Sequence, residues 1–285
     1  MSTPRPWTSA DPPHAPAFRP AGGPVNLVHR AAATLRPPLW DEARDVLLVQ
    51  KRRRTIMRQD SPLDAHGLPV LIVGGITSTE RALSPLCEWL HKLNCRCLVA
   101  PVRFGVDCGA RTARSVERAL EQLTEATGQR ALVVAHSRGG HFARAVAVRR
   151  PELHRGLITL GSPLCRMLAV HPLLLAQVAV IGLAGSLGVP GLMRAGCLWG
   201  ECCARFRTDL QRPFPSEVPF LSVYSPDDQV VDWRSTLDPA ARHRSVAATH
   251  AGLLWSSESL SAIAEEIGSL VDGEPFYPYQ ERVPA

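Results

Sequence analysis

Short runs of consecutive apolar residues alternate along this chain with longer stretches in which apolar residues recur every three or four positions. The short runs lie at 69–73, 97–100, 130–135, 156–160 and 218–224, with a weaker one at 245–248. The helical spacing lies at 79–93, 111–127, 139–150 and 258–271. Strands and helices that alternate in this way predict an α/β fold with a mostly parallel sheet and helices on both of its faces.

The two ends of the chain depart from this alternation. Prolines punctuate residues 1–38, whereas residues 41–58 combine charged and apolar positions at the spacing of a helix. We therefore expect an N-terminal proline-rich arm and a leading helix at 1–66, a main domain at 67–273 and an irregular C-terminal tail at 274–285.

The composition excludes several classes of protein. Of the 285 residues, 45% are hydrophobic and 20% are charged, which is typical of a globular protein and excludes disorder over most of the chain. The formal charge is +6, and the densest basic run lies at 51–54. This run has no interleaved aromatic residues and no nucleic-acid-binding motif, so we expect a solvated helix face and no nucleic-acid partner. Peripheral contact with an anionic membrane surface remains an alternative.

The cellular compartment decides whether the cysteines are expected as free thiols or as disulfides. Residues 1–24 lack the apolar core of a secretory signal peptide, which predicts a cytoplasmic protein, with membrane association left open. The eight cysteines are then expected to stay reduced. The groups at 95–97 and 202–203 do not form two separated CxxC halves, and no histidine stands at zinc-binding spacing, so the pattern predicts no metal site. A disulfide within the group formed by Cys197 and residues 202–203 is the alternative.

The most informative stretch is Ala-His-Ser-Arg-Gly-Gly at 135–140, which joins a predicted strand to a predicted helix. A serine at such a turn is held at strained backbone angles, so small residues are needed two positions before and after it. Ala135 and Gly139 occupy these positions around Ser137. The turn places the Ser137 hydroxyl at the carboxyl edge of the sheet, where ligands bind in open α/β folds. Ser137 is therefore the candidate nucleophile, and a strand-to-helix turn without chemistry is the alternative.

A serine nucleophile needs a base, and the base needs an acid that orients it. Asp227 and Asp228 follow the predicted strand at 218–224, and His243 and His250 lie on either side of the weaker run at 245–248. Only one aspartate can be the acid and only one histidine the base, and the residues alone do not decide between the members of either pair.

Negative charge that develops on a carbonyl oxygen is stabilised by two backbone N–H donors. The residue after the candidate nucleophile, Arg138, supplies one of them. The loop Gly-Gly-Ile-Thr at 74–77 supplies the other, with Ile76 favoured over Thr77. The Arg138 side chain has two interpretations: a surface position on the helix, or binding of a carboxylate or phosphate near the site.

In this order the motifs resemble the α/β-hydrolase superfamily, and within it the small lipase and triacylglycerol-lipase-like group. The resemblance covers residues 68–272. It is carried by VLIVGGI at 70–76, AHSRGG at 135–140, LGSP at 160–163, SPDDQVV at 225–231 and THAGLLW at 249–255.

The resemblance implies a choice between the candidates. The D-x-V-V pattern of the family selects Asp228 as the acid and leaves Asp227 to stabilise the turn. The base of the family lies in the loop after the last strand, which selects His250 over His243. The sequence departs from the family at Ala135, which replaces the first glycine of G-x-S-x-G, and before Gly75, where lipases carry the histidine of H-G-x-x.

Residues 164–215 interrupt the alternation, and the resemblance does not extend to them. The stretch 173–189 is apolar and long enough to raise the question of a membrane span. It falls between two strands of one sheet, however. A single membrane span would leave the chain on the far side of the bilayer, so the chain could not return to the same sheet. We expect a helical cap over the candidate site, with Leu174 and Ile181 lining an acyl pocket. A helical excursion with only a structural role is the alternative.

The resemblance implies a serine hydrolase of the lipase or esterase type. It would cleave a small-molecule acyl ester or lipid through an acyl-Ser137 intermediate, without a metal or an organic cofactor. A thioesterase or acyltransferase with the same three residues is the first alternative. A non-catalytic, membrane-associated binding protein on the same scaffold is the second, and an intact triad argues against it.

Overall fold

The computed structural model describes residues 56–57, 61–76, 78–102 and 105–273. All of them belong to the second of two compact units into which the chain divides, which spans 38–285. The predicted arm, almost all of the predicted leading helix and the predicted tail lie outside the described residues.

Six strands form one sheet in the order β2-β1-β3-β4-β5-β6, and each strand is parallel to its neighbours. The strands are β1 (Pro69–Val73), β2 (Arg96–Val99), β3 (Ala131–His136), β4 (His154–Leu160), β5 (Phe220–Tyr224) and β6 (Arg242–Ser245). The predicted parallel sheet is therefore confirmed. The last strand lies three residues before the apolar run that predicted it, because an edge strand tolerates charged side chains such as Arg242 and Arg244.

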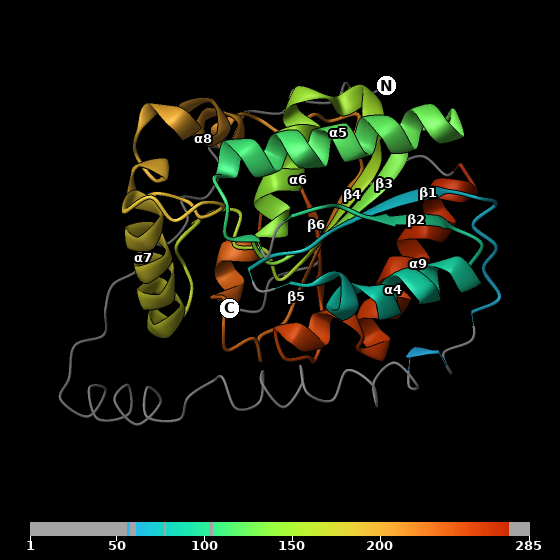
Figure 1. Cartoon of the computed structure of the whole chain (residues 1–285). Helices are drawn as coiled ribbons and strands as arrows, with labels where there is room; N and C mark the ends of the chain where they lie inside the picture. The colour runs from blue at the N-terminus through green and yellow to red at the C-terminus, as the bar shows by residue number, and fades with distance from the viewer. Residues whose placement is uncertain (1–55, 58–60, 77, 103–104, 274–285) are drawn as a thin grey trace, which may run out of the picture. The chain divides into compact units, whose positions relative to one another are not determined.

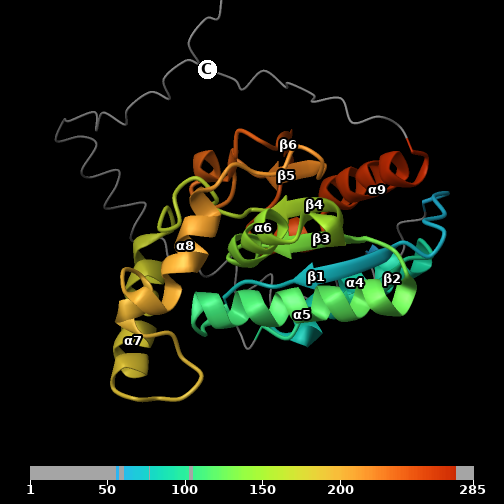
Figure 2. The same ribbon diagram turned by 90° about the horizontal axis from the view of Figure 1, so that it is seen from above.

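Helices cover both faces of the sheet (Figures 1 and 2). The bounds are α4 (Glu80–Lys92), α5 (Gly109–Thr127), α6 (Gly139–Arg149) and α9 (Ser257–Val271). Successive side chains of a strand point to opposite faces. Val70 and Ile72 of β1 therefore pack in a core with α4 and α9, whereas Leu71 and Val73 pack in a second core with α5 and α6. Single-turn helices lie at η2 (Pro151–Leu153), η5 (Trp233–Thr236) and η6 (Ala251–Leu254).

The order of the strands fixes where a site can form. The chain passes from β1 to β2 on one side and then returns to place β3 on the other side of β1. The helices that follow β1 and β3, α4 and α6, therefore pack on opposite faces of the sheet. Such a switch point leaves a crevice at the carboxyl edge of an open parallel sheet, and ligands bind there in α/β folds.

The insert consists of two helices with different roles, α7 (Pro172–Ser186) and α8 (Ala204–Gln211). Figure 1 shows α7 apart from the two helical layers and α8 beside α5 and α6. Phe206 of α8 is buried in the core, with its ring 5.9 Å from that of Phe142. Only the part of the insert before α8 is therefore available to cap the crevice, and α8 completes one face of the sheet.

The chain that returns from α7 packs closely against it. A Cβ on Gly185 would lie 2.1 Å from the carbonyl oxygen of Met193, so only glycine allows this approach. The opposite side of α7 is apolar but exposed, at Val180 and Leu183, and Leu187 is exposed directly after the helix. Within the described part of the chain, no helix has the length and apolarity that a membrane span requires.

Candidate active site

Ser137 stands at the turn between β3 and α6. Its φ of +54° lies in the left-handed region, which costs a residue other than glycine about 1–2 kcal/mol. The surroundings permit this turn because they are small. A Cβ on Gly139 would lie 2.3 Å from the carbonyl oxygen of Val73, and a Cβ on Gly75 would lie 2.7 Å from the Ser137 Cβ. The strained serine that the sequence predicts is therefore present at the carboxyl edge of the sheet.

The loop after β1 packs directly against this turn. A Cβ on Gly75 would lie 2.9 Å from the backbone nitrogen of Arg138. The Gly75 N–H itself donates to Ser78 Oγ at 3.0 Å, so Ile76 carries the next N–H along the loop. Thr77, the less favoured donor, lies outside the described residues. The predicted donors Ile76 and Arg138 thus come from loops after the adjacent strands β1 and β3, and their use as an oxyanion hole stays a prediction.

Asp228 and His250 form a hydrogen-bonded pair after β5 and β6. His250 Nδ1 donates to Asp228 Oδ2 at 2.7 Å, and the Asp228 side chain is only 1% exposed. Asp228 Oδ1 accepts the N–H groups of Val230 and Val231, each at 2.8 Å. Because an ionised carboxylate only accepts hydrogen bonds, the proton is on Nδ1, and Nε2 is the ring nitrogen that can act as a base. The alternative acid, Asp227, is exposed.

The remaining histidines near this pair have structural contacts. His136 Nε2 donates to the backbone oxygen of His250 at 3.0 Å, and the two rings lie 4.7 Å apart. His141 Nε2 donates to the carbonyl oxygen of Pro163 at 3.0 Å. His243, the alternative base, lies on β6 and bonds to a backbone oxygen. Among these four histidines, only His250 contacts a carboxylate.

Three buried histidines make the stability of the fold depend on pH. Burial lowers the pKa of His136 to about 3, and those of His141 and His154 to about 4, from an ordinary value of 6.5. The unfolded chain therefore takes up protons first as the pH falls. Each histidine should destabilise the fold by about 1 kcal/mol at about pH 5.5 relative to neutral pH.

The measurement is the urea midpoint at neutral pH and at about pH 5.5. We expect a lower midpoint at the acidic pH. In His154→Gln, which lies away from the candidate site, about a third of that difference should disappear. Equal midpoints at the two pH values would contradict the assignment of three neutral buried histidines.

A narrow pocket of about 60 Å³ lies between the Ser137 turn and the insert. Its walls include Ile76, Ser137, Arg138 and His141 from the core and Leu174, Leu175 and Val178 from α7. Leu174 therefore lines the pocket, whereas Ile181 does not. Ile181 packs against Met193 and neighbouring cysteines, because it lies about 10 Å further along the axis of α7.

Sequence reasoning missed the part of the pocket that is not helical. Met167, Val170 and Met193 line it from segments before and after α7. Val170 forms an isolated antiparallel bridge with Val231, in the loop that carries Asp228. This bridge holds the segment that leads into α7 against the loop that carries Asp228. An isolated bridge has no run of alternating residues, so the sequence holds no signal for it.

No family model matches this chain, and no curated protein matches it in sequence. Solved structures do match. The mature form of the Bacillus licheniformis lipase BlEst2 has 12% sequence identity, covers 74% of this chain and 95% of the lipase, and superposes with a TM-score of 0.52. A structure of the metagenome-derived lipolytic enzymes LipS and LipT has 15% identity, covers 73% and 94%, and has a TM-score of 0.53.

A third structure, 2-hydroxy-6-oxo-6-phenylhexa-2,4-dienoate hydrolase from Rhodococcus sp. strain RHA1, has 16% identity, covers 72% of this chain and 92% of its own, and has a TM-score of 0.50. The chain has the α/β-hydrolase fold. At these identities the likeness shows the fold alone, and the role of the candidate site depends on the residues of this chain.

The Arg138 side chain of this α/β-hydrolase fold takes neither of the two positions considered from the sequence. It donates to the carbonyl oxygens of Gly105 at 2.7 Å and Asp107 at 3.5 Å, and it lies 5.4 Å from the centre of the Phe142 ring. Burial lowers its pKa from the ordinary value. A Cβ on Gly105 would lie 2.8 Å from Ile76 N, so Arg138 braces the segment that contacts the loop after β1.

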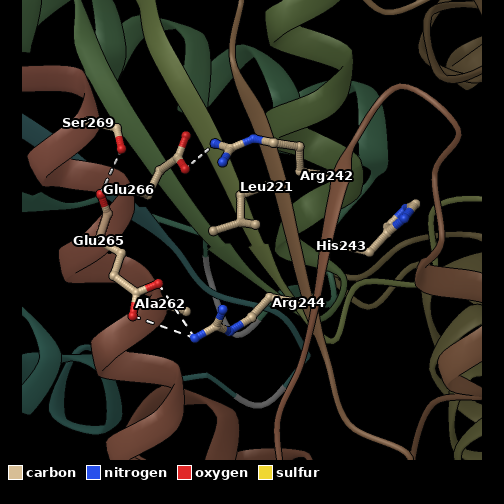
Figure 3. A pocket seen from close by; sticks show the side chains of 8 residues that line it. All are labelled: Leu221, Arg242, His243, Arg244, Ala262, Glu265, Glu266 and Ser269. Carbon is tan, nitrogen blue, oxygen red and sulfur yellow. Dashed lines mark hydrogen bonds and ion pairs between the residues drawn. The ribbon is translucent and has the colours of Figure 1, made fainter. Parts of the chain in front are cut away.

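A larger cavity of about 240 Å³ lies elsewhere, between β6 and α9 (Figure 3). Arg242 pairs there with Glu266, and Arg244 pairs with Glu265. Figure 3 shows His243, between the two arginines, on the other side of the strand. Because the charges on this wall are paired with one another, we assign the cavity to the edge of the sheet and not to the candidate active site.

Proposed function

We propose that this chain is a serine hydrolase that cleaves carboxylic esters through an acyl-Ser137 intermediate. One observation carries the proposal. A strained serine and a buried Asp228–His250 pair, joined at 2.7 Å, both lie at the carboxyl edge of one parallel sheet. A nucleophile, a base and an acid that fixes the tautomer of the base are the groups that acyl transfer requires.

The proposed reaction follows from the proton positions. Nε2 of His250 takes the Ser137 hydroxyl proton while Oγ bonds to the ester carbonyl carbon, and the carbonyl π electrons move to the oxygen. The N–H groups of Arg138 and Ile76 are the proposed donors to that oxygen. The C–O bond then breaks, and the leaving alkoxide takes the proton from Nε2. Water attacks the acyl-serine in the same way and releases the acid.

The pocket favours a short, apolar acyl group. Its volume of about 60 Å³ is room for roughly four water-sized groups, since one water needs about 10–15 Å³. A longer acyl chain would require α7 to shift. Lipid substrates and peripheral membrane contact remain predictions. Such a contact would form at the exposed Val180 and Leu183 of α7 and at Leu187 directly after it.

The activity is tested with p-nitrophenyl esters and acyl thioesters of the same chain lengths, each assayed on the purified protein. We expect turnover of the esters. No turnover of any compound would contradict the proposed function. A higher kcat/KM for the thioesters would replace esters by thioesters as the substrate class.

Leu174→Trp is expected to shorten the preferred acyl chain, because the larger ring fills the pocket that Leu174 lines. Each buried methylene contributes about 0.8 kcal/mol, which is about fourfold in kcat/KM. The matched control is Val180→Trp, on the exposed side of α7. The measurement is kcat/KM against chain length from two to ten carbons. A flat profile in the wild-type protein, unchanged in both variants, would contradict the acyl pocket.

A further inference from the structure

Four cysteines from separate segments of the chain meet beside the candidate active site. Cys108 immediately precedes α5, Cys197 ends η3 (Ala195–Cys197), and Cys202 and Cys203 end η4 (Glu201–Cys203). All four sulfur atoms lie within 4.8 Å of one another. Their separations include 3.3 Å for Cys108–Cys203, 3.6 Å for Cys197–Cys202 and 3.9 Å for Cys202–Cys203.

These separations are those of ligands around one tetrahedral ion. Sulfur atoms about 2.3 Å from a tetrahedral zinc ion lie about 3.8 Å from one another. A disulfide requires sulfur atoms at about 2.05 Å, and all four cysteines carry free thiols. Three of them are buried, and only Cys202 is exposed. The cluster therefore has a closed interior and one side that an ion can reach.

A backbone N–H donor and the N-terminus of a helix lie at the cluster. The Arg194 N–H donates to Cys197 Sγ at 3.4 Å. The N–H groups of Arg111 and Thr112, in the first turn of α5, donate to the carbonyl oxygen of Cys108 at 3.0 and 2.9 Å, so Cys108 stands at the N-terminus of this helix. N–H donors and the positive end of a helix both stabilise thiolates, and such outer contacts orient the ligands of a metal ion.

Positive charge also faces the cluster. The hydrogen bonds of the Arg138 guanidinium go to the backbone oxygens of Gly105 and Asp107, so it lies beside the segment that carries Cys108. A zinc ion with four thiolates carries a net charge of −2, which Arg138 and the N-terminus of α5 would offset.

The loop that carries Cys197 and Cys202 is held in shape by another arginine. Arg207 donates to the carbonyl oxygens of Cys197 at 3.1 Å, Trp199 at 3.0 Å and Gly200 at 2.9 Å. The ligands from the insert are therefore held in place by contacts outside the cluster itself, as is usual for metal-binding loops.

We propose that Cys108, Cys197, Cys202 and Cys203 bind one structural Zn²⁺ ion that fastens the cap to the start of α5. Four sulfur ligands at tetrahedral separations select zinc among the common divalent ions. A full set of four protein ligands leaves no position for a reactive water, so the ester chemistry proposed at Ser137 does not involve the ion. The local spacing of cysteines predicts no such site, because Cys108 lies 95 residues before Cys203.

The test is the metal content of the full-length protein purified under reducing conditions, measured by mass spectrometry, together with the visible spectrum after Co²⁺ replacement. We expect one zinc per chain and the d–d absorption of tetrahedral, thiolate-bound Co²⁺. Cys202→Ser changes an exposed side chain and should fold. It should lose zinc to a chelator at least about tenfold more readily than the wild-type protein.

The matched control is Cys165→Ser, an exposed cysteine outside the cluster, which should hold zinc as the wild-type protein does. A protein without zinc that gives no Co²⁺ spectrum would overturn the proposal, as would equal zinc retention in both variants. An intact mass that shows cysteines of the cluster joined in disulfides would also overturn it, and so would bound iron in place of zinc. None of these measurements depends on ester hydrolysis.

Discussion

Ser137→Ala is expected to remove ester hydrolysis while leaving the protein folded. Alanine keeps the Cβ that the turn accommodates and removes only the oxygen that bonds to the substrate. Loss of the nucleophile in a serine hydrolase lowers kcat by about 10⁶-fold. The measurement is kcat for the best ester, with circular dichroism to verify the fold. If the variant retained more than about a tenth of the wild-type turnover, Ser137 would not be the nucleophile.

The strain at Ser137 gives this prediction a second, independent outcome. Glycine adopts a φ of +54° without an energetic penalty, whereas serine and alanine adopt it only at a cost in free energy. Ser137→Gly should therefore be as inactive as Ser137→Ala but more stable than the wild-type protein, by about 1 kcal/mol. Ser84→Ala, on α4, is the matched control and should change neither quantity. A Ser137→Gly variant less stable than the wild-type protein would contradict the strained turn.

Asp228→Asn is expected to lower kcat by about 10⁴-fold, because the variant holds His250 in the wrong tautomer. The N–H groups of Val230 and Val231 both point at Oδ1, so the amide oxygen of asparagine should remain there. The amide NH₂ then faces His250 Nδ1 in place of Oδ2. It donates to Nδ1, which moves the imidazole proton to Nε2 and removes the base.

Asp227→Asn is the matched control for this variant. Asp227 is exposed and adjacent to Asp228, so its substitution changes the same loop and the same charge. We expect its kcat to stay within a few-fold of the wild-type value. Equal losses in the two variants, or a larger loss in Asp227→Asn, would contradict the assignment of Asp228 as the orienting acid.

The parts of this fold that the sequence predicts are those set by local rules. The run around β3 is continuously apolar because that strand is buried on both faces, and the helix after it begins at two glycines. The small residues around Ser137 are required by contacts with the neighbouring loop, so the motif can be recognised from the sequence alone. The bounds of β6 and the positions of its arginines are harder to predict from the sequence, because an edge strand has little apolar pattern.

The parts that the sequence does not predict depend on contacts between distant segments. Leu174 and Ile181 share one face of α7, and nothing in their spacing shows that the pocket ends between them. The Arg138 side chain binds carbonyl oxygens of residues 105 and 107, a contact that only the folded loop defines. The cysteines at 197–203 acquire their fourth partner from the start of α5, which no local spacing can indicate.

The proposed function is tested most directly by treating the intact protein with a fluorophosphonate and locating the adduct by peptide mass spectrometry. This reagent bonds covalently to a serine that an adjacent base activates. The proposal predicts a single adduct on Ser137, formed rapidly at neutral pH and absent from Ser137→Ala. A protein that remains unlabelled, or that is labelled on a different residue, would contradict the proposal that Ser137 is the activated nucleophile of a hydrolase.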